Sequence, residues 1–200
     1  EERDGTFTFE MPDSRVTIEA TFVPVAEDIV PEIPTDWANP YADVAANAWY
    51  YDAVAYVAAN GLMTGTSAIT FAPDATTTRA MIWTVLARMN GQNVDGGTPW
   101  YTLAQSWAVT ANVSDGTNPG NPISREELAT MLYRAAGSPT VSGNLLSYPD
   151  GSNVSAWAES AMLWATQNGI ISGIDGMLTP QGQATRAQVA TMLMRFREAI

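Results

Sequence analysis

The chain has no cysteine, no histidine and no lysine, and each absence removes a class of chemistry. Without cysteine there is neither a disulfide framework nor a thiol nucleophile, and without histidine the usual general base and the commonest neutral metal ligand are missing. No apolar signal core and no run of eighteen apolar residues is present, so we expect no targeting segment and no membrane insertion. The start EERDGTFTFE has no initiator methionine, and we expect a piece of a longer protein with upstream domains as partners.

Positive charge is also scarce. All 9 cations are arginines, against 21 Asp and Glu residues, which gives a formal net charge of −12 and a pI of about 4.1. Such a chain repels nucleic acid and anionic membrane surfaces as a whole, so neither is an expected partner, and any bound anion must be held by local groups. The 200 residues, 46% of them hydrophobic and 7 of them tryptophan, are enough for a real core.

Residues 1–36 precede the repetitive part of the chain. Residues 1–24 alternate in polarity on both sides of Pro12-Asp13, which predicts a β-hairpin. A lone hairpin is only marginally stable, so we expect it to complete a β domain further upstream, and its sequence resembles the closing strands of small β repeats in large bacterial surface proteins. Residues 25–36 are rich in proline and acids without periodicity, which predicts an extended linker.

From residue 37 onward the chain repeats itself three times, with predicted repeats at 37–91, 92–137 and 138–200. The repeats align on the tryptophans Trp49, Trp100 and Trp157. Without a gap, the same alignment superimposes the loop glycines Gly65, Gly116 and Gly173. The second repeat is the divergent one.

Arginines mark the second half of each repeat. The segments TTTRAMIWTVLARM, PISREELATMLYRA and QATRAQVATMLMRF align on the helix-start arginines Arg79, Arg125 and Arg186. Nine residues after each stands a distal arginine, and these are Arg88, Arg134 and Arg195. Six of the 9 cations therefore occupy two repeated positions, which chance would rarely produce.

Each repeat is predicted to form a helix, a glycine-containing loop and a second helix. Asn60-Gly61 and Asn168-Gly169 are left-handed stop signals for the first helix, and Asn112-Val113 stands in their place in the middle repeat.

The second helices begin after Ser or Thr. Ser124 with Glu127, and Thr185 with Gln188, match the capping box, in which side chains satisfy unpaired amides of the first turn. Thr78 has no such partner because Met81 occupies the third position, so we expect its cap to be the weakest.

Apolar side chains recur at helical spacing on each second helix and form one stripe. The stripes are Ile82, Val85, Leu86 and Met89; Leu128, Met131 and Leu132; and Val189, Met192, Leu193 and Phe196. One two-helix unit cannot bury both of its faces, so three should pack together. The predicted fold is therefore mainly α, with three helix-loop-helix repeats in a pseudo-threefold bundle and a short N-terminal β-hairpin fragment.

The first and third repeats share a longer set of motifs. In the first these are Tyr41, Asp43-Val44, Trp49, Asn60-Gly61, Gly65 and Thr78-Arg79-Ala80; in the third they are Tyr148, Asp150, Trp157, Asn168-Gly169, Gly173 and Thr185-Arg186-Ala187. This pattern resembles the S-layer homology family, whose tandem triplets hold bacterial surface proteins on the cell wall. The middle repeat departs from it, with no Asp-Val opening and with Ser124-Arg125-Glu126-Glu127 near its end.

The resemblance implies a three-pronged spindle that binds a secondary cell-wall polysaccharide in grooves between prongs. In many relatives that polymer bears a pyruvate ketal on N-acetylmannosamine. Carried over to this chain, Arg79, Arg125 and Arg186 would meet the ketal carboxylate. Gly65, Gly116 and Gly173 would let the backbone approach the sugar, and Trp49, Trp100 and Trp157 would stack on ring faces. Because the middle repeat departs from the family pattern, sugar binding is least expected in the groove of that repeat.

Elementary electrostatics supports an anion site at each helix-start arginine. A helix N-terminus carries positive partial charge and free amide hydrogens, and arginine adds a planar fork that grips a carboxylate with two parallel bonds. Screening confines distant charges to about 8 Å, so the net negative charge does not prevent this.

Each candidate residue also has a structural interpretation. The helix-start arginines are explained equally well by pairing with the chain's own acids, such as Asp43, Asp74 or Asp150. A structural role is favoured for the distal arginines, whose stems can cover apolar surface, and for the tryptophans, which are more often core. The glycines are required by backbone geometry first.

Metal binding and catalysis are not predicted. The turns DGTN from Asp115 and DGSN from Asp150 are rich in oxygen but do not continue into an EF-hand loop, so turn chemistry explains them better. Without histidine or cysteine only a carboxylate pair of the glycosidase type remains, and no such pair recurs. We expect no metal, no cofactor and no enzyme.

The predicted function is non-covalent cell-wall anchoring of an exported protein at the bacterial surface, through an anionic polysaccharide bound between repeats. The alternative is a degenerate triplet that serves as a protein-interaction or surface-assembly domain without polysaccharide binding.

Overall fold

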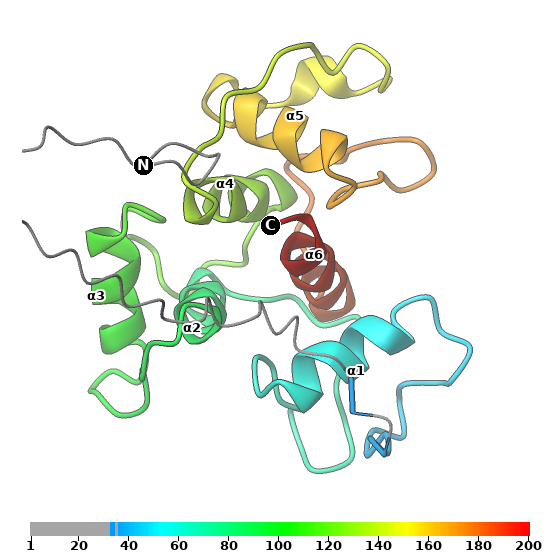
Figure 1. The fold of residues 1–200 in the computed structure, drawn as a ribbon, viewed down its shortest axis with the longest axis vertical. Helices are drawn as coiled ribbons and strands as arrows, with labels where there is room; N and C mark the ends of the chain where they lie inside the picture. The colour runs from blue at the N-terminus through cyan, green and yellow to red at the C-terminus, as the bar shows by residue number, and fades with distance from the viewer. Residues whose placement is uncertain (1–32, 35) are drawn as a thin grey trace, which may run out of the picture.

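The computed structural model describes residues 33–34 and 36–200, which form a helical bundle (Figure 1). Its helices are α1 (Tyr51–Ala59), α2 (Arg79–Met89), α3 (Thr102–Thr110), α4 (Arg125–Ala135), α5 (Glu159–Gln167) and α6 (Arg186–Ala199), with short 3-10 turns η1 (Gly151–Asn153) and η2 (Ala156–Ala158) before α5. Within this part of the chain, β pairing is limited to isolated bridges. The prediction of a mainly α fold is confirmed, whereas the predicted hairpin and most of the predicted linker lie outside the described residues.

The three second helices start as their caps predict. The side chains of Ser124 and Thr185 accept from the amides of Glu127 and Gln188, and both capping boxes are complete. Thr78 accepts only the amide of Met81, at 3.4 Å and without a reciprocal bond. The prediction that the Thr78 cap is the weakest is confirmed.

The first helices end in a left-handed residue, which reverses the chain into the loop. Gly61 and Gly169 have φ of 64° and 69°, as their Asn-Gly signals predict. In the middle repeat the left-handed residue is Asn112, with φ of 56°, directly after the C-cap Ala111. Asn112 therefore takes the place of the glycine, and assigning Asn112-Val113 to the Asn-Gly position was wrong by one residue. Asn fits because its short polar side chain tolerates this conformation better than other side chains.

Helices pair across repeat boundaries. In Figure 1, α2, α4 and α6 surround the centre and α1, α3 and α5 lie outside them. The packed pairs are α2 with α3, α4 with α5, and α6 with α1. The second helix of each repeat therefore packs against the first helix of the next, and the third repeat closes the ring onto the first.

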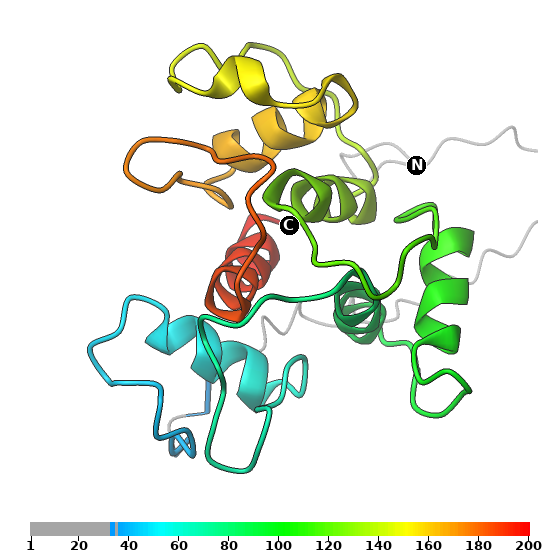
Figure 2. The same cartoon turned by 180° about the vertical axis from the view of Figure 1, so that it is seen from behind.

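The ring is joined at its centre by three backbone hydrogen bonds. The amide of Thr77 donates to the carbonyl of Ala184 (3.3 Å), Ala184 to Ile123 (2.9 Å), and Ile123 to Thr77 (2.8 Å). Each of these residues directly precedes a helix cap, and Figure 2 shows the three segments running in toward the centre. This closed cycle fixes the starts of α2, α4 and α6 relative to one another.

The apolar stripes on the second helices form the core. Ile82, Leu86, Leu128, Leu132 and Leu193 are fully buried. Trp83, next to this stripe on α2, is fully buried as well. Since three separate stripes converge, burial of each depends on the other repeats.

Candidate functional site

The helix-start arginines occupy the first position of α2, α4 and α6 and are buried, with 8%, 5% and 8% exposure for Arg79, Arg125 and Arg186. Each Nε donates to a loop carbonyl of the next repeat in the ring. The acceptors are the carbonyls of Thr117 for Arg79 (2.9 Å), Leu178 for Arg125 (2.8 Å) and Phe71 for Arg186 (2.7 Å). The same three side chains thus join neighbouring repeats.

The first-turn amides of these helices are occupied, so the expectation of free amide hydrogens was wrong. In α4 the amides of Arg125 and Glu126 donate to the carbonyls of Gly182 and Pro180, both at 2.9 Å. The first two amides of α2 and α6 are bonded to neighbouring loops in the same way, and the third amide of each helix bonds the cap. Any anion here must be held by the guanidinium groups.

The terminal nitrogens of the three guanidiniums have different partners. Arg79 donates from Nη1 to Glu127 and from Nη2 to Asp115, both at 2.6 Å. Arg186 donates from Nη2 to the carbonyl of Thr64 (2.6 Å) and lies over the ring of Phe71, 4.5 Å from its centroid. In the part of the chain that is described, Nη1 and Nη2 of Arg125 have no hydrogen-bond partner.

Internal neutralisation therefore applies to Arg79, but its partners are not the acids expected from the sequence. Asp43 and Asp150 instead accept backbone amides of the loops that hold the arginines. Asp43 accepts from Phe71 (2.8 Å) and Ala72 (2.7 Å), and Asp150 accepts from Leu178 (2.8 Å) and Thr179 (2.7 Å). Asp74 is exposed.

The electrostatics follows from this arrangement. Burial raises the pKa of the Asp150 carboxyl, but the amides of Leu178 and Thr179 and the charge of Arg125 outweigh it, so the pKa lies below its usual value. Asp43 has its pKa lowered in the same way by Phe71, Ala72 and Arg186. Burial lowers the pKa values of Arg125 and Arg186, opposed by Asp150 and Asp43, with Tyr41 also opposing it at Arg186. Both arginines stay charged because their usual pKa lies far above neutral.

Each helix-start arginine lines a groove along the second helix of the following repeat. The α2 groove, of about 420 Å³, contains Arg186, Arg88 and Trp100. The α6 groove, of about 430 Å³, contains Arg125, Arg195 and Trp49. The α4 groove, of about 290 Å³, contains Arg79, Arg134 and Trp157. Every groove therefore takes its loop and helix from one repeat, its buried arginine from the preceding repeat and its tryptophan from the following one.

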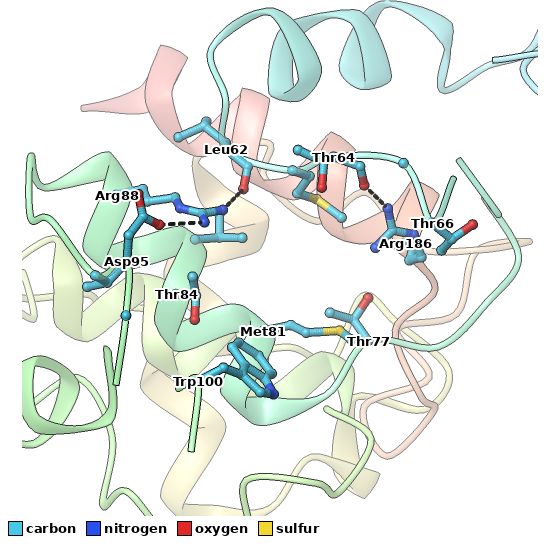
Figure 3. A pocket seen from close by; sticks show the side chains of 15 residues that line it. Leu62, Thr64, Thr66, Thr77, Met81, Thr84, Arg88, Asp95, Trp100 and Arg186 are labelled. Atoms are coloured by element: carbon cyan, nitrogen blue, oxygen red, sulfur yellow. Dashed lines mark hydrogen bonds and ion pairs between the residues drawn. The ribbon is translucent and has the colours of Figure 1, made fainter. Parts of the chain in front are cut away.

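Figure 3 shows the α2 groove, with Arg88 and Arg186 on opposite sides and with Met81, Thr84 and Trp100 below them in this view. Arg88 donates to the carbonyl of Leu62 and to Asp95, both at 3.5 Å. Its side chain is 36% exposed, so the two sides of the groove offer one buried and one accessible guanidinium.

The groove tryptophans are exposed, by 68% for Trp49, 53% for Trp100 and 58% for Trp157, so the interpretation of these side chains as core was wrong. They lie before the helices α1, α3 and α5 rather than on their packed faces. Side chains further along the same helices pack inward instead: Tyr56 and Trp164 are buried and Trp107 is partly buried.

The loop glycines divide into two that line grooves and one that does not. At Gly65 a Cβ would lie 2.5 Å from the ring of Tyr41, and Gly173 has φ of 84°. These two line the α2 and α6 grooves. Gly116, with φ of 72°, is absent from the lining of the α4 groove, and its carbonyl accepts from Gln105 (2.6 Å).

Two sets of groove residues were not among the predicted site residues. The distal arginines Arg88, Arg134 and Arg195 line the three grooves, and so do Thr84, Thr130 and Thr191. Each of these threonines stands five residues after its helix-start arginine, so the repeat alignment contained the signal. Their hydroxyls donate to the carbonyl one turn earlier.

Two further properties concern the described residues alone. They contain no group of three or more acidic side chains placed to hold a metal ion. Among their helices, none combines the length and apolar character that crossing a bilayer requires.

The fold and grooves define a helical-repeat module in which one groove design, with an arginine from each of two repeats, recurs three times around a central ring. A family model described as S-layer homology domain matches residues 40–80 and 147–190, which lie in the first and third predicted repeats. The chain therefore carries S-layer homology sequence at two sites.

The similar proteins are large. The chain is 33% identical over 112 residues to the "Surface-layer 125 kDa protein" of Lysinibacillus sphaericus, covering 47% of the chain and 10% of that protein. It is 27% identical over 193 residues to an "Endoglucanase" of Bacillus sp. (strain KSM-635), covering 88% and 20%. It is 26% identical over 182 residues to an "Amylopullulanase" of Thermoanaerobacterium thermosulfurigenes, covering 82% and 10%.

The chain thus spans a fifth or less of the length of these curated relatives. The two S-layer homology matches place the chain at the bacterial cell surface, and domains of this kind are cell-wall anchoring modules.

Proposed function

We propose that this chain is a non-catalytic anchor that binds an anionic secondary cell-wall polysaccharide in its grooves and so tethers an exported protein to the wall. The ligand group is a carboxylate, such as a pyruvate ketal on N-acetylmannosamine. The catalytic names of the glucanase and pullulanase relatives are not carried over, because the chain covers so little of them.

The α6 groove is the observation that carries this proposal. Its lining includes Arg125 and Arg195 and no acidic side chain. Arg125 is buried, with 5% exposure, and its side chain is held only by the bond from Nε to the carbonyl of Leu178. Both terminal nitrogens are without a partner in the described part of the chain. A guanidinium so placed can donate two parallel bonds to a carboxylate in a site where water competes poorly.

Uncharged contacts complete the same groove. Trp49 offers an exposed ring, and Gln188 and Ser172 offer polar side chains beside Gly173. An aromatic face together with nearby hydrogen-bonding groups suits a sugar, which has apolar ring faces and polar edges. These contacts limit how much affinity must come from charge on a chain of net charge −12.

Retention of the protein on purified cell wall tests the proposal. Wall carrying its polymer should retain the chain, and wall stripped of polymer by acid should not. Equal retention on the two would reject polysaccharide binding and favour the alternative, an interaction or assembly domain.

Arg125→Lys should weaken binding to polymer-bearing wall by about tenfold, equivalent to about 1.4 kcal/mol. Lysine keeps the charge but has a single ammonium group. It therefore cannot hold the carbonyl of Leu178 and at the same time donate two parallel bonds to a carboxylate. Arg195→Ala in the same groove is the matched variant and should cost less, because Arg195 is only partly buried and water competes there more strongly than at the buried Arg125. Equal losses, with melting temperatures unchanged, would contradict the assignment of Arg125 as the main anion contact.

A further inference from the structure

We infer that the α4 groove is closed to anionic ligands by two carboxylates of the chain itself, so that this module binds its polymer through the α2 and α6 grooves only. The inference rests on the proposed function, and it assigns Asp115 and Glu127 as the residues that set groove specificity.

Asp115 and Glu127 occupy the anion position at Arg79. They take Nη1 and Nη2 at 2.6 Å each, and Ser114 Oγ also accepts from Nη2 (3.3 Å), while Nε is held by the carbonyl of Thr117. Both terminal nitrogens of Arg79 are therefore bonded to acids of the chain. Those of Arg125 have no partner in the described part of the chain.

The repeat alignment shows that these two acids are substitutions within a common groove design. Asp115 stands where Thr64 and Ser172 stand in the other repeats, and Glu127 stands where Met81 and Gln188 stand. All four neutral residues line their own grooves, as the two acids do. The middle repeat thus has a carboxylate at both positions that face a helix-start arginine, and the other repeats have none.

Both acids are held in place by further bonds. Glu127 Oε2 accepts from the amide of Ser124 (2.8 Å) in the capping box, and Asp115 accepts from the amide (3.0 Å) and hydroxyl (2.9 Å) of Thr117. The Thr117 amide and the charge of Arg79 lower the pKa of Asp115 against the raising effect of burial, so this carboxyl is ionised at neutral pH. A ligand carboxylate would have to displace both acids or approach them as a third negative charge.

Charge and volume agree with this assignment. The charged residues lining the α4 groove are two arginines and two acids, against two arginines and Asp95 in the α2 groove and two arginines alone in the α6 groove. The α4 groove is also the smallest of the three, at about 290 Å³ against about 420 and 430 Å³.

The exposed tryptophans allow each groove to be observed separately. We would titrate the whole chain with the methyl glycoside of N-acetylmannosamine carrying a pyruvate ketal and follow the indole N–H NMR signals of Trp49, Trp100 and Trp157, assigned through Trp→Phe variants. The signals of Trp49 and Trp100 should shift saturably, and that of Trp157 should not. A saturable shift of Trp157 at comparable concentration would overturn the inference while leaving the proposed function intact. No shift at any tryptophan would overturn the proposed function and this inference with it.

Exchanging residues between repeats tests the two acids directly. The pair Asp115→Thr and Glu127→Gln should open the α4 groove, so that Trp157 responds and calorimetry counts three sites instead of two. Glutamine keeps the capping box, as Gln188 does in α6.

The reverse pair, Ser172→Asp and Gln188→Glu, should close the α6 groove and abolish the Trp49 response, because it supplies Arg125 with the partners that Arg79 has. This pair adds ion pairing and keeps a capping residue, so it remains informative if the first pair does not fold. A folded reverse variant whose Trp49 still responds with wild-type affinity would overturn the assignment of the two acids.

Discussion

At the scale of single residues, three arginines are buried at the helix starts, and each is compensated differently. Burying a guanidinium without partners is unfavourable, since its hydration is lost. All three donate from Nε to a loop carbonyl, which leaves the terminal nitrogens Nη1 and Nη2 in need of partners. Arg79 meets two acids, Arg186 meets a carbonyl and the Phe71 ring, and Arg125 is balanced by the nearby charge of Asp150.

Asp150→Asn should lower the melting temperature at neutral pH and reduce the loss of stability in acid. The folded pKa of Asp150 lies below its unfolded value of about 3.9, so its contribution is present above that value and is lost as pH falls through the folded pKa. Asparagine would also turn a donor toward the amide of Leu178 or Thr179, which costs about 1–3 kcal/mol. Thermal unfolding between pH 2 and 7 measures both effects.

The exposed Asp74 supplies the control for that experiment, and Asp74→Asn should match the wild type throughout. If Asp150→Asn showed the same acid dependence as the wild type, the carboxylate of Asp150 would not be responsible.

Trp49→Ala should leave stability within about 0.5 kcal/mol of wild type and weaken binding to polymer-bearing wall between about twofold and tenfold. Trp49 is 68% exposed and lines the α6 groove, so removal of its ring leaves no core cavity. Trp83→Ala is the contrasting variant, since Trp83 is fully buried and its loss should cost about 3–5 kcal/mol. Denaturant unfolding and wall retention separate the two roles, and a large stability loss in Trp49→Ala would assign that ring to the core.

At the scale of elements, each second helix begins at a junction between repeats. Its cap side chain satisfies the third amide, and a neighbouring loop satisfies the first two. The same junction positions the arginine and the central hydrogen-bond cycle. Helix start, repeat contact and groove wall are therefore one structural unit.

Ser124→Ala should destabilise the protein by about 1 kcal/mol, which corresponds to about 2–4 °C in melting temperature, and Thr78→Ala should cost less. Ser124 belongs to a complete capping box, whereas Thr78 accepts one long bond of 3.4 Å. Thermal unfolding of the two variants side by side measures the difference. A larger loss for Thr78→Ala would mean that backbone contacts, not cap side chains, determine the stability of these helix starts.

At the scale of the whole molecule, closure of the ring makes the three repeats interdependent. Among the described residues, the first helix, α1, packs against the last, α6, so the inner face of α1 is covered only when α6 is in place. A linear array of self-contained repeats would not have this property.

Deletion of residues 186–200 should therefore expose the backbone amides of α1, at the opposite end of the repeat region, to hydrogen exchange. Hydrogen exchange should show α1 unprotected in the truncated chain, because the α1·α6 contact is lost and one bond of the central cycle is weakened. Protection of α1 at wild-type level would show that the first repeat is autonomous.

The predictable part of this protein is the part that depends on neighbouring residues. Caps at Ser124 and Thr185, the weak cap at Thr78 and the apolar stripes were all recognisable, because each involves side chains within one or two helical turns. The exposure of Trp49 was not, since helical spacing alone cannot show where a helix begins relative to an aromatic residue. Nor were the partners of Arg79, which lie 36 and 48 residues away.

The sequence by itself determined the three helix-loop-helix repeats, the register of the arginines and the divergence of the middle repeat, because local backbone preference and periodic burial act over short distances. Only the tertiary structure decided which helices pair, that every groove draws on all three repeats, and that one arginine is neutralised internally. Those outcomes depend on close packing and on charges brought within bonding distance by the closed ring, which no single repeat contains.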